Sequence, residues 1–252
     1  MKMPIIFLGH GNPMNVLYKE KDFMSALQKI IPHIEKSKGI IFISAHWINN
    51  KTSITANNNP EIIYDFYGFP KELYEINMNL KGDEQLSYDI AKKLEIELDK
   101  KRGFDHGVWT LLKLINIPIT KPVFQISINN KFSLEEHFQF AKKLKTLQEE
   151  GYLIIASGNV VHNLYDIDFN LHEAYPWAIE FNTNIKELIT NKDTSKLLKY
   201  EKLKNSHLAN PELSHYIPLI YIMSLIDEKD KIEFIYDKIQ NGSISMLSFI
   251  TK

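Results

Sequence analysis

Three histidines of this chain closely follow short apolar runs that end in turn residues. They are His10, His46 and His162, and the runs before them are residues 4–8, 39–44 and 152–157. Apolar runs without alternation are typical of strands that are buried on both faces of a sheet. Because ligands bind beyond the carboxyl ends of the strands in open α/β sheets, one sheet edge could bring these imidazoles together.

Two further histidines lie near predicted helix starts. His106 belongs to the Gly-Phe-Asp-His-Gly stretch 103–107, and His215 lies one turn into a helix that we expect to begin at Asn210-Pro211. Neutral imidazoles bind iron, zinc, copper and nickel, so the set predicts a metal site. The alternative is that each histidine is only a polar group at the end of an element, since no His-Glu-x-x-His pair places two ligands on one helix face.

The other four histidines have a different setting. His33 and His137 fall within amphipathic helical patterns, whereas His172 and His207 lie in polar, loop-like stretches. We interpret all four as surface or structural residues.

The composition excludes several classes of site and partner. The chain of 252 residues has no cysteine, which removes disulfides, thiolate metal ligands and cysteine nucleophiles together. The formal net charge of −1 gives no basic surface for nucleic acid. No stretch approaches the roughly 20 apolar residues of a membrane span, and residues 1–8 do not resemble a secretory signal. We therefore expect a cytoplasmic protein that binds neither nucleic acid nor membrane.

The elements around the histidines predict an α/β fold. A further apolar run covers residues 122–128, and helical patterns separate the runs. Residues 83–100 place leucine or isoleucine at every fourth position, and Ser133 with Glu136 forms a capping-box pattern for a helix to about Glu150, which Gly151 would end. We expect a single domain over residues 1–252, with a mostly parallel central sheet flanked by helices and the metal site at the C-terminal edge of the strands.

Six short motifs make the sequence recognisable. Together they resemble the class III extradiol ring-cleavage dioxygenases, specifically the DOPA 4,5-dioxygenase type, over nearly the whole chain. The motifs, in chain order, are residues 9–14, 44–47, 64–70, 103–107, 156–163 and 212–216.

The resemblance implies a role for each of the five histidines. It implies a metal centre on His10, His46 and His215, with His162 beside the metal as a fourth ligand in zinc-loaded forms or as an acid/base in turnover. It also implies that His106 lies on the substrate side. More distant relatives use two histidines and a glutamate around Fe(II), whereas this all-nitrogen set also suits Zn(II).

The activity that the resemblance implies is the insertion of O2 into a catechol beside its two hydroxyl groups. Turnover would use Fe(II), and Zn(II) is expected in the isolated protein. We assign the proton transfer first to His162 and second to His106, because histidine titrates near neutral pH. A neutral His106 could also donate a hydrogen bond to a developing oxygen anion.

Residues in and near the aromatic segment 64–70 are expected on the substrate side. Trp47, Asp65 and Tyr67 are the candidates, and Asp65 could instead hydrogen-bond a ligating histidine. The small-molecule partners are then a DOPA-like catechol and O2. The identity of the catechol and the oligomeric state are left open by the sequence.

Two other functions fit the same histidines. A zinc hydrolase could use a metal-bound water against an ester or amide, although no acidic residue occupies an obvious general-base position. A non-catalytic, metal-binding homologue would not require both His162 and His106.

Overall fold

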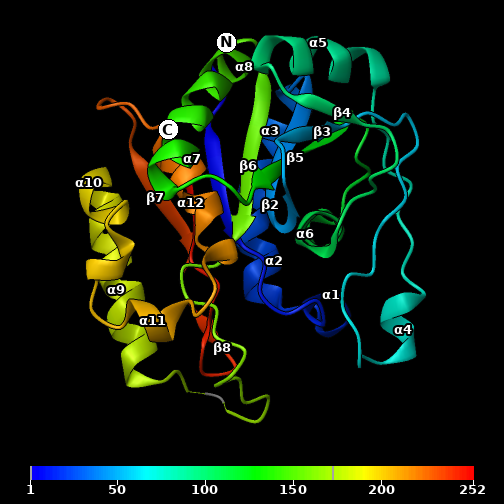
Figure 1. Cartoon of the computed structure of the whole chain (residues 1–252). Coiled ribbons are helices and arrows are strands. Elements are labelled where there is room, and N and C mark those ends of the chain that lie inside the picture. Colours follow the sequence, from blue (N-terminus) through cyan, green and yellow to red (C-terminus); the bar gives the residue numbers. More distant parts are fainter. Residues whose placement is uncertain (1, 172) are drawn as a thin grey trace.

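One eight-stranded sheet runs through the protein (Figure 1). The computed structural model describes residues 2–171 and 173–252, and the strand order is β4-β3-β5-β2-β6-β1-β10-β7. The bounds of these strands are β1 Ile5–Gly9, β2 Gly39–Asn49, β3 Ser53–Thr55, β4 Glu97–Asp99, β5 Val123–Asn129, β6 Tyr152–Gly158, β7 Ile232–Tyr236 and β10 Ser248–Thr251. A short ribbon pairs β8 (Ile239–Gln240) with β9 (Ile244–Ser245).

The four central strands are parallel, as their continuous apolar runs predict. β1 pairs with β6, β6 with β2 and β2 with β5, all in parallel register, and β1, β5 and β6 are buried along their whole length. The outer strands add antiparallel pairs, with β10 between β1 and β7. Ile6 lies opposite Ile250, and Phe7 lies opposite Phe249. The predicted α/β class with a mostly parallel centre is therefore confirmed.

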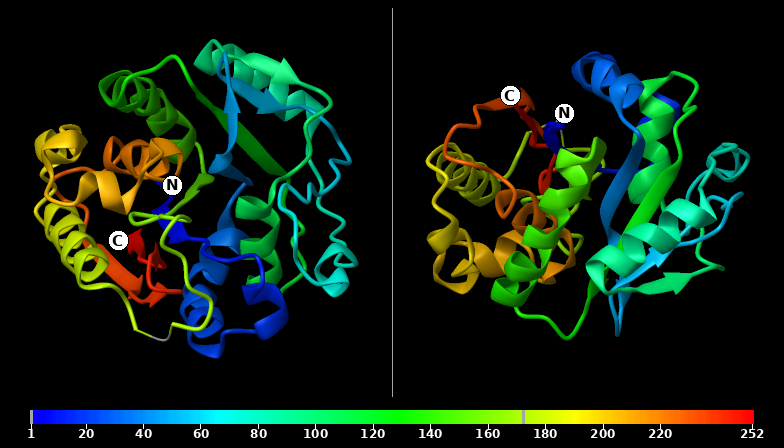
Figure 2. Two further views of the ribbon diagram at one scale, coloured as in Figure 1. Left: turned by 60° about the horizontal axis from the view of Figure 1, so that its bottom comes forward. Right: turned by 90° about the horizontal axis from the view of Figure 1, so that it is seen from above.

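Helices cover both faces of this sheet, as the view from above shows (Figure 2). Alternate residues of β1 point to opposite faces, so that Ile5 and Phe7 join one apolar cluster while Ile6 and Leu8 join another. The first cluster includes residues of α5 (Glu84–Leu94), α7 (Leu134–Ala141), α8 (Lys145–Glu149), α9 (Pro176–Thr190), α10 (Thr194–Leu197), α11 (Ser206–Ala209) and α12 (Ile217–Met223). The second includes residues of α1 (Asn15–Tyr18), α2 (Lys21–Leu27), α3 (Ile31–Lys36), α4 (Lys71–Tyr74) and α6 (His106–Ile115).

Two predicted helices are shorter or less regular than their sequence patterns indicate. The helix expected over residues 83–100 ends at Leu94, where Glu95 adopts a left-handed conformation, and Leu98 lies in β4. The capping box of Ser133 and Glu136 forms as predicted. The helix that it opens is interrupted by a 3-10 turn over Lys142–Leu144, and Gly151 follows with φ +99°.

The prediction that a helix begins at Asn210-Pro211 is wrong. Asn210 is the residue that ends α11, and its side-chain amide donates to the Val160 carbonyl oxygen at 2.7 Å. The chain instead forms a 3-10 turn, η4 (Leu213–His215), before α12 begins. His215 is thus the last residue of a short turn, and this turn carries it to the sheet edge.

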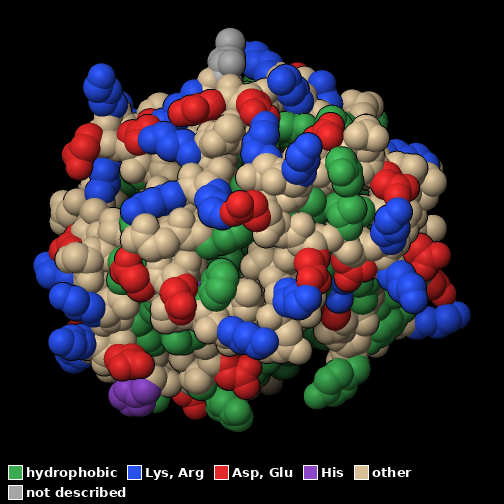
Figure 3. All heavy atoms as spheres, turned by 45° about the horizontal axis from the view of Figure 1, so that its top comes forward, with side chains coloured by type: hydrophobic (Ala, Val, Ile, Leu, Met, Phe, Trp, Pro, Cys, Tyr) green, Lys and Arg blue, Asp and Glu red, His purple; other side chains and the backbone are tan. Residues whose placement is uncertain are grey.

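The second apolar run also differs from its prediction, because β2 continues five residues beyond Ser44 and contains His46. The long polar segment that follows is mostly irregular but includes β3 and α4. In the part of the chain that the structure describes, no helix is both long and apolar enough to cross a membrane. The face drawn in Figure 3 mixes Lys and Arg with Asp and Glu, in keeping with the balanced composition.

Candidate metal centre

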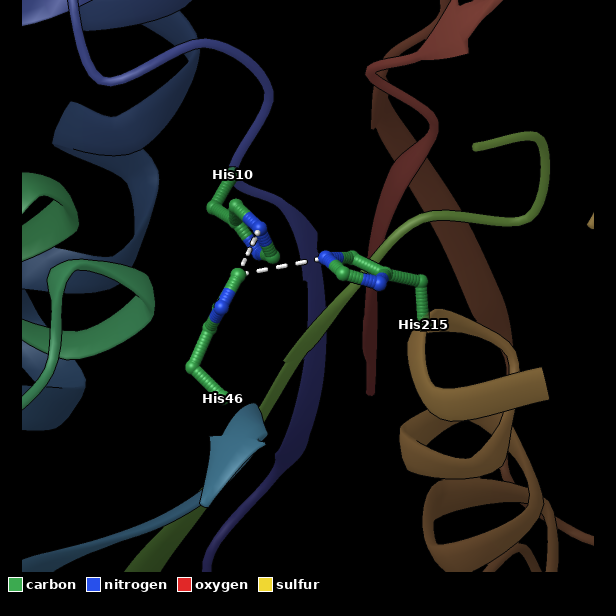
Figure 4. A group of neighbouring side chains, drawn as sticks. All are labelled: His10, His46 and His215. Atoms are coloured by element: carbon green, nitrogen blue, oxygen red, sulfur yellow. Dashed lines mark hydrogen bonds between the residues drawn. The ribbon is translucent and has the colours of Figure 1, made fainter. Parts of the chain in front are cut away.

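Three imidazole rings converge on one point beyond the C-terminal ends of the central strands (Figure 4). The Nε2 atom of His46 lies 3.0 Å from Nε2 of His10 and 3.1 Å from Nε2 of His215. His10 directly follows β1, His46 lies within the extension of β2, and His215 ends η4. The sheet edge therefore brings together residues that are far apart in sequence.

The hydrogen bonds of these rings leave their Nε2 lone pairs free to face one another. The Ser157 hydroxyl donates to the Gly107 carbonyl oxygen at 2.6 Å, so its oxygen accepts from Nδ1 of His10 at 3.0 Å. The Asp65 carboxylate lies 3.3 Å from Nδ1 of His46, and its negative charge favours a proton on that nitrogen. In a neutral imidazole a proton on Nδ1 leaves Nε2 unprotonated, which is the form that binds a metal.

His215 is oriented in a similar but weaker way, since its Nδ1 lies 3.2 Å from the Ser214 hydroxyl. Nitrogens that each lie about 2.1 Å from one ion are roughly 3.0 to 3.4 Å apart, a spacing that the observed nitrogen pairs match. Nitrogen ligands of this kind suit both Fe(II) and Zn(II). The residues present therefore fit a metal ion.

Burial keeps the three rings neutral. Desolvation lowers the pKa of His10, His46 and His215 well below the usual value, and the neighbouring histidines lower it further. Protonating one ring would place a positive charge beside several other imidazoles in a site with little water. Neutral rings are ready to bind a cation without first releasing protons.

Asp65 connects His46 with His106. Its Oδ1 accepts hydrogen bonds from the main-chain N–H and Nδ1 of His106, at 2.9 and 3.0 Å, while Oδ2 faces His46. Burial alone would raise the pKa of Asp65, but its hydrogen bonds and charge interactions with the two histidines lower it to about 2. The rings of His46 and His106 lie 3.9 Å apart. The carboxylate is therefore ionised and orients both rings.

His162 lies against His215 rather than among the three converging nitrogens. The two rings are stacked, with centroids 3.5 Å apart and planes at 3°. Among the described residues, two groups have possible ligand atoms within 4.8 Å of one another, and neither includes His162: one is His10, His46 and His215, and the other is His46, Asp65 and His106. Burial, with a smaller contribution from His106, lowers the pKa of His162 to about 4, so this ring is neutral at neutral pH.

Aromatic residues of the segment 64–70 approach the site from the side of His106. The Phe66 ring lies 5.5 Å from the His106 ring and also contacts Tyr74 and Trp109. Tyr67, in contrast, is 93% exposed. In this structure its side chain lies at the surface.

Trp47 is buried, and the Arg102 guanidinium lies 5.4 Å from its ring centroid. Sequence reasoning did not single out Trp109, Ser157 or Ser214. A serine at the end of a buried strand was the available signal for Ser157. The contact between the Ser214 hydroxyl and His215 depends on a turn that the sequence did not predict.

Three of the four remaining histidines are described by the structure, and they lie outside the cluster. His137 is buried, and its Nδ1 lies 3.1 Å from the Tyr221 hydroxyl of α12, whereas His33 is half-buried and His207 is exposed. These positions agree with the predicted structural and surface roles. His172 lies outside the described residues.

Comparison with known proteins identifies the class to which this site belongs. Residues 4–249 match the family described as the catalytic LigB subunit of aromatic ring-opening dioxygenase. The chain belongs to this family, and it is an oxidoreductase of the extradiol dioxygenase type.

Individual proteins of known sequence or structure are similar to this chain over nearly its whole length. The chain is 36% identical to a protein of Escherichia coli K12 named 4,5-DOPA dioxygenase extradiol, and the match covers 98% of this chain and 94% of the relative. A protein of Beta vulgaris with the same name is 32% identical, with coverage of 96% and 94%. A crystal structure of an uncharacterized Escherichia coli K12 protein is similar throughout, with a TM-score of 0.79, 31% identity and coverage of 99% of this chain and all of that one.

Proposed function

We propose that this protein opens the ring of a DOPA-like catechol with O2, and that His10, His46 and His215 hold the Fe(II) required for turnover. The convergence of three Nε2 atoms, with spacings of 3.0 and 3.1 Å, is the observation that supports the proposal most. Three protein ligands leave coordination positions for the diol and for O2. The names of the relatives support the choice of a DOPA-like compound.

The metal decides between this activity and a hydrolytic one. Bound Fe(II) would supply the one-electron chemistry that allows a diol and O2 to react, which Zn(II) lacks because it has no accessible redox change. We propose that the all-nitrogen site also takes up Zn(II) in the isolated protein, and that this form does not open rings. The cytoplasmic location expected from the sequence remains part of the proposal.

His162 is the proposed base for the diol. It is neutral at neutral pH, with a pKa lowered to about 4, and so it can accept a proton from a catechol hydroxyl. Its ring stacks on His215 and thus lies next to a metal ligand. The same position keeps open the alternative that His162 becomes a fourth ligand to Zn(II).

His106 is the second candidate for proton transfer. Asp65 accepts a hydrogen bond from Nδ1–H of His106. In a neutral His106 the other ring nitrogen, Nε2, then carries a lone pair and accepts hydrogen bonds. This tautomer favours a role as a base over the expected role of a neutral hydrogen-bond donor. Phe66 lies beside His106 and would contact the ring of the substrate, and we retain Trp47 and Tyr67 as proposed substrate-side residues.

The test is O2 uptake after anaerobic loading with Fe(II), using DOPA, a caffeate-like acid and unsubstituted catechol. We expect uptake with formation of a yellow ring-opened product under Fe(II) and none under Zn(II). His162→Ala should lower turnover by roughly 10²- to 10⁴-fold while catechol still binds. No uptake with any catechol under Fe(II) would overturn the proposed function, and undiminished turnover would remove His162 from it.

A further inference from the structure

His46 lies in an irregular part of β2. Along β5 the register advances by two residues, from Ile126 to Ile128, while along β2 it advances by five, from Ile43 to Ile48. Three additional residues of β2 are therefore accommodated in a bulge that includes His46. Bulged residues lose their partners in the ladder, so their main-chain groups need other hydrogen bonds.

Both main-chain polar groups of His46 are bound by side chains. Its N–H donates to Oγ of Ser44 at 3.2 Å, and its carbonyl oxygen accepts from a guanidinium nitrogen of Arg102 at 3.1 Å. These two side chains replace the missing strand neighbour. One comes from β2 itself and the other from the loop before α6.

Asp105 joins Ser44 to Arg102. Its Oδ1 accepts from the Ser44 hydroxyl at 2.7 Å, and its Oδ2 lies 3.2 Å from the same guanidinium nitrogen that binds His46. A Gln125 amide from β5 also donates to Oδ2. Asp105, Ser44, the main chain of His46 and Arg102 thus form one closed ring of hydrogen bonds, which we name the Asp105 ring.

The carboxylate of Asp105 is fully buried and makes no capping bond to α6, although Asp105 occupies the N-cap position. A side-chain cap stabilises a helix by about 1 kcal/mol, and Asp105 forgoes it. The next residue is His106. The Asp105 ring therefore fixes the main chain at His46 and at the start of α6, directly before His106.

We propose that Asp105, Ser44 and Arg102 are positioning residues that set the affinity of the metal centre by holding the bulge of β2, so that Nε2 of His46 points toward His10 and His215. The proposal rests on the proposed function in one respect, since it requires that these histidines bind a metal. Residues behind metal ligands commonly change affinity by about 10- to 100-fold when they are replaced.

The closing experiment compares two buried serines. Ser44 is a member of the Asp105 ring. Ser87, on α5, is equally buried, but its hydroxyl donates to the Thr55 carbonyl oxygen at 2.8 Å. Zn(II) affinity is measured by competition with a chromophoric chelator, the visible spectrum of the Co(II)-loaded protein reports the geometry of the ligands, and thermal unfolding of the metal-free protein reports stability.

We expect Ser44→Ala to weaken Zn(II) binding by about 10- to 100-fold and to alter the Co(II) spectrum. Ser87→Ala should lower the unfolding temperature and leave affinity and spectrum unchanged. Equal affinities for Ser44→Ala and the unmodified protein would overturn the proposal. Failure of the unmodified protein to bind Zn(II) or Co(II) would count against the metal centre itself. That outcome differs from failure of the positioning proposal, in which the unmodified protein binds the metal and Ser44→Ala binds it equally well.

Two milder variants keep the test decisive if Ser44→Ala does not fold. Arg102→Lys keeps the positive charge but cannot present the planar guanidinium nitrogen that binds both His46 and Asp105. Asp105→Asn keeps the shape and removes the charge. Each should weaken Zn(II) binding, and the effects of the two changes together should be smaller than their sum because both act through one ring. Independent effects that add would contradict a single ring.

Discussion

On one side of the metal centre, His46 is surrounded by hydrogen-bonding groups, whereas on the other side His215 lies against the ring of His162. We name His46, Asp65 and His106 the polar side, and His162 and His215 the stacked side. An ionised carboxylate fixes two rings on the polar side. On the stacked side, the neutral Ser214 hydroxyl and a parallel ring hold His215.

This difference shows how one site can hold some histidines in fixed positions and keep another imidazole available to accept a proton. A neutral imidazole has one acceptor nitrogen, and it can take a proton from a substrate when no protein group occupies that nitrogen. Among the described residues, no other side chain hydrogen-bonds the ring of His162, which stacks on His215. The polar side therefore determines ligand geometry, and the stacked side retains an imidazole that can take up a proton.

The largest effect should come from removing the ligand shared by both nitrogen pairs. Metal binding by a complete structural site contributes about 10 to 16 kcal/mol, so the loss of one of three ligands should weaken Zn(II) binding by roughly 10³-fold. We expect this for His46→Ala, measured by chelator competition. His33→Ala, a helical histidine outside the cluster, serves as the control and should bind Zn(II) normally. Retained affinity in His46→Ala would end the comparison of the two sides.

Acid should act on the elements that support the stacked side. His137 contacts Tyr221 of α12, the helix that follows His215, and burial lowers its pKa to about 4. The unfolded chain, with a histidine pKa of about 6.5, takes up this proton first as the pH falls. The stabilising contribution is complete above pH 6.5 and decreases by about 3 kcal/mol by pH 4.

The variant His137→Gln removes this titration. Urea unfolding at pH 7 and pH 4 should show a loss of stability on acidification that is about 3 kcal/mol smaller than in the unmodified protein. An identical pH dependence in the two proteins would show that His137 does not contribute to acid sensitivity.

His46 on the polar side and His215 on the stacked side each have one side chain next to Nδ1, and the effects of removing these two side chains can be compared. Asp65→Asn removes a charge that orients His46 and His106, and we expect metal affinity to fall by about 10- to 100-fold. Ser214→Ala removes a neutral partner of His215, and the fall should be smaller because charged hydrogen bonds are stronger. Zn(II) competition measures both variants. A larger effect from Ser214→Ala would reverse the assignment of the two sides.

The smallest effects should come from two glycines. A Cβ at Gly158 would lie 2.4 Å from the carbonyl oxygen of His215, a backbone atom. A Cβ at Gly107 would lie 2.5 Å from Oγ of Ser44, a side-chain atom that moves more easily than backbone, although its movement would disturb the Asp105 ring. Thermal unfolding should show a loss of about 2 kcal/mol for Gly158→Ala and about 1 kcal/mol for Gly107→Ala. Equal losses would show that the stacked side yields as readily as the polar side.

The sequence predicted the parts of this site that depend on local patterns. Continuous apolar runs identified the central parallel strands, and the end of the first run placed His10 at the sheet edge. His46 also lies at this edge, but within the extended β2 and not in the turn that the sequence predicted. The residues that the resemblance assigned to the metal do converge in the structure. Their chemical roles remain predictions that the experiments above test.

The sequence did not predict features that depend on distant partners. The extension of β2 through His46 requires Arg102 and Asp105, which lie more than fifty residues away. Asn210 does not begin a helix because its amide binds Val160. The helix expected to include Leu98 stops early because Ile96 and Leu98 also alternate as a strand does, and β4 forms beside β3.

The pairing of β1 with β10 has a consequence for the order in which the site is completed during synthesis. Ile6 and Phe7 lie next to Ile250 and Phe249, and the Gly9 N–H donates to Oγ of Ser248 at 3.0 Å, one residue before His10. A ribosome therefore makes His10 early but supplies the strand that borders β1 only some 240 residues later. Until then that edge of β1 is open, and a nascent chain offers it to chaperones or to a neighbouring chain.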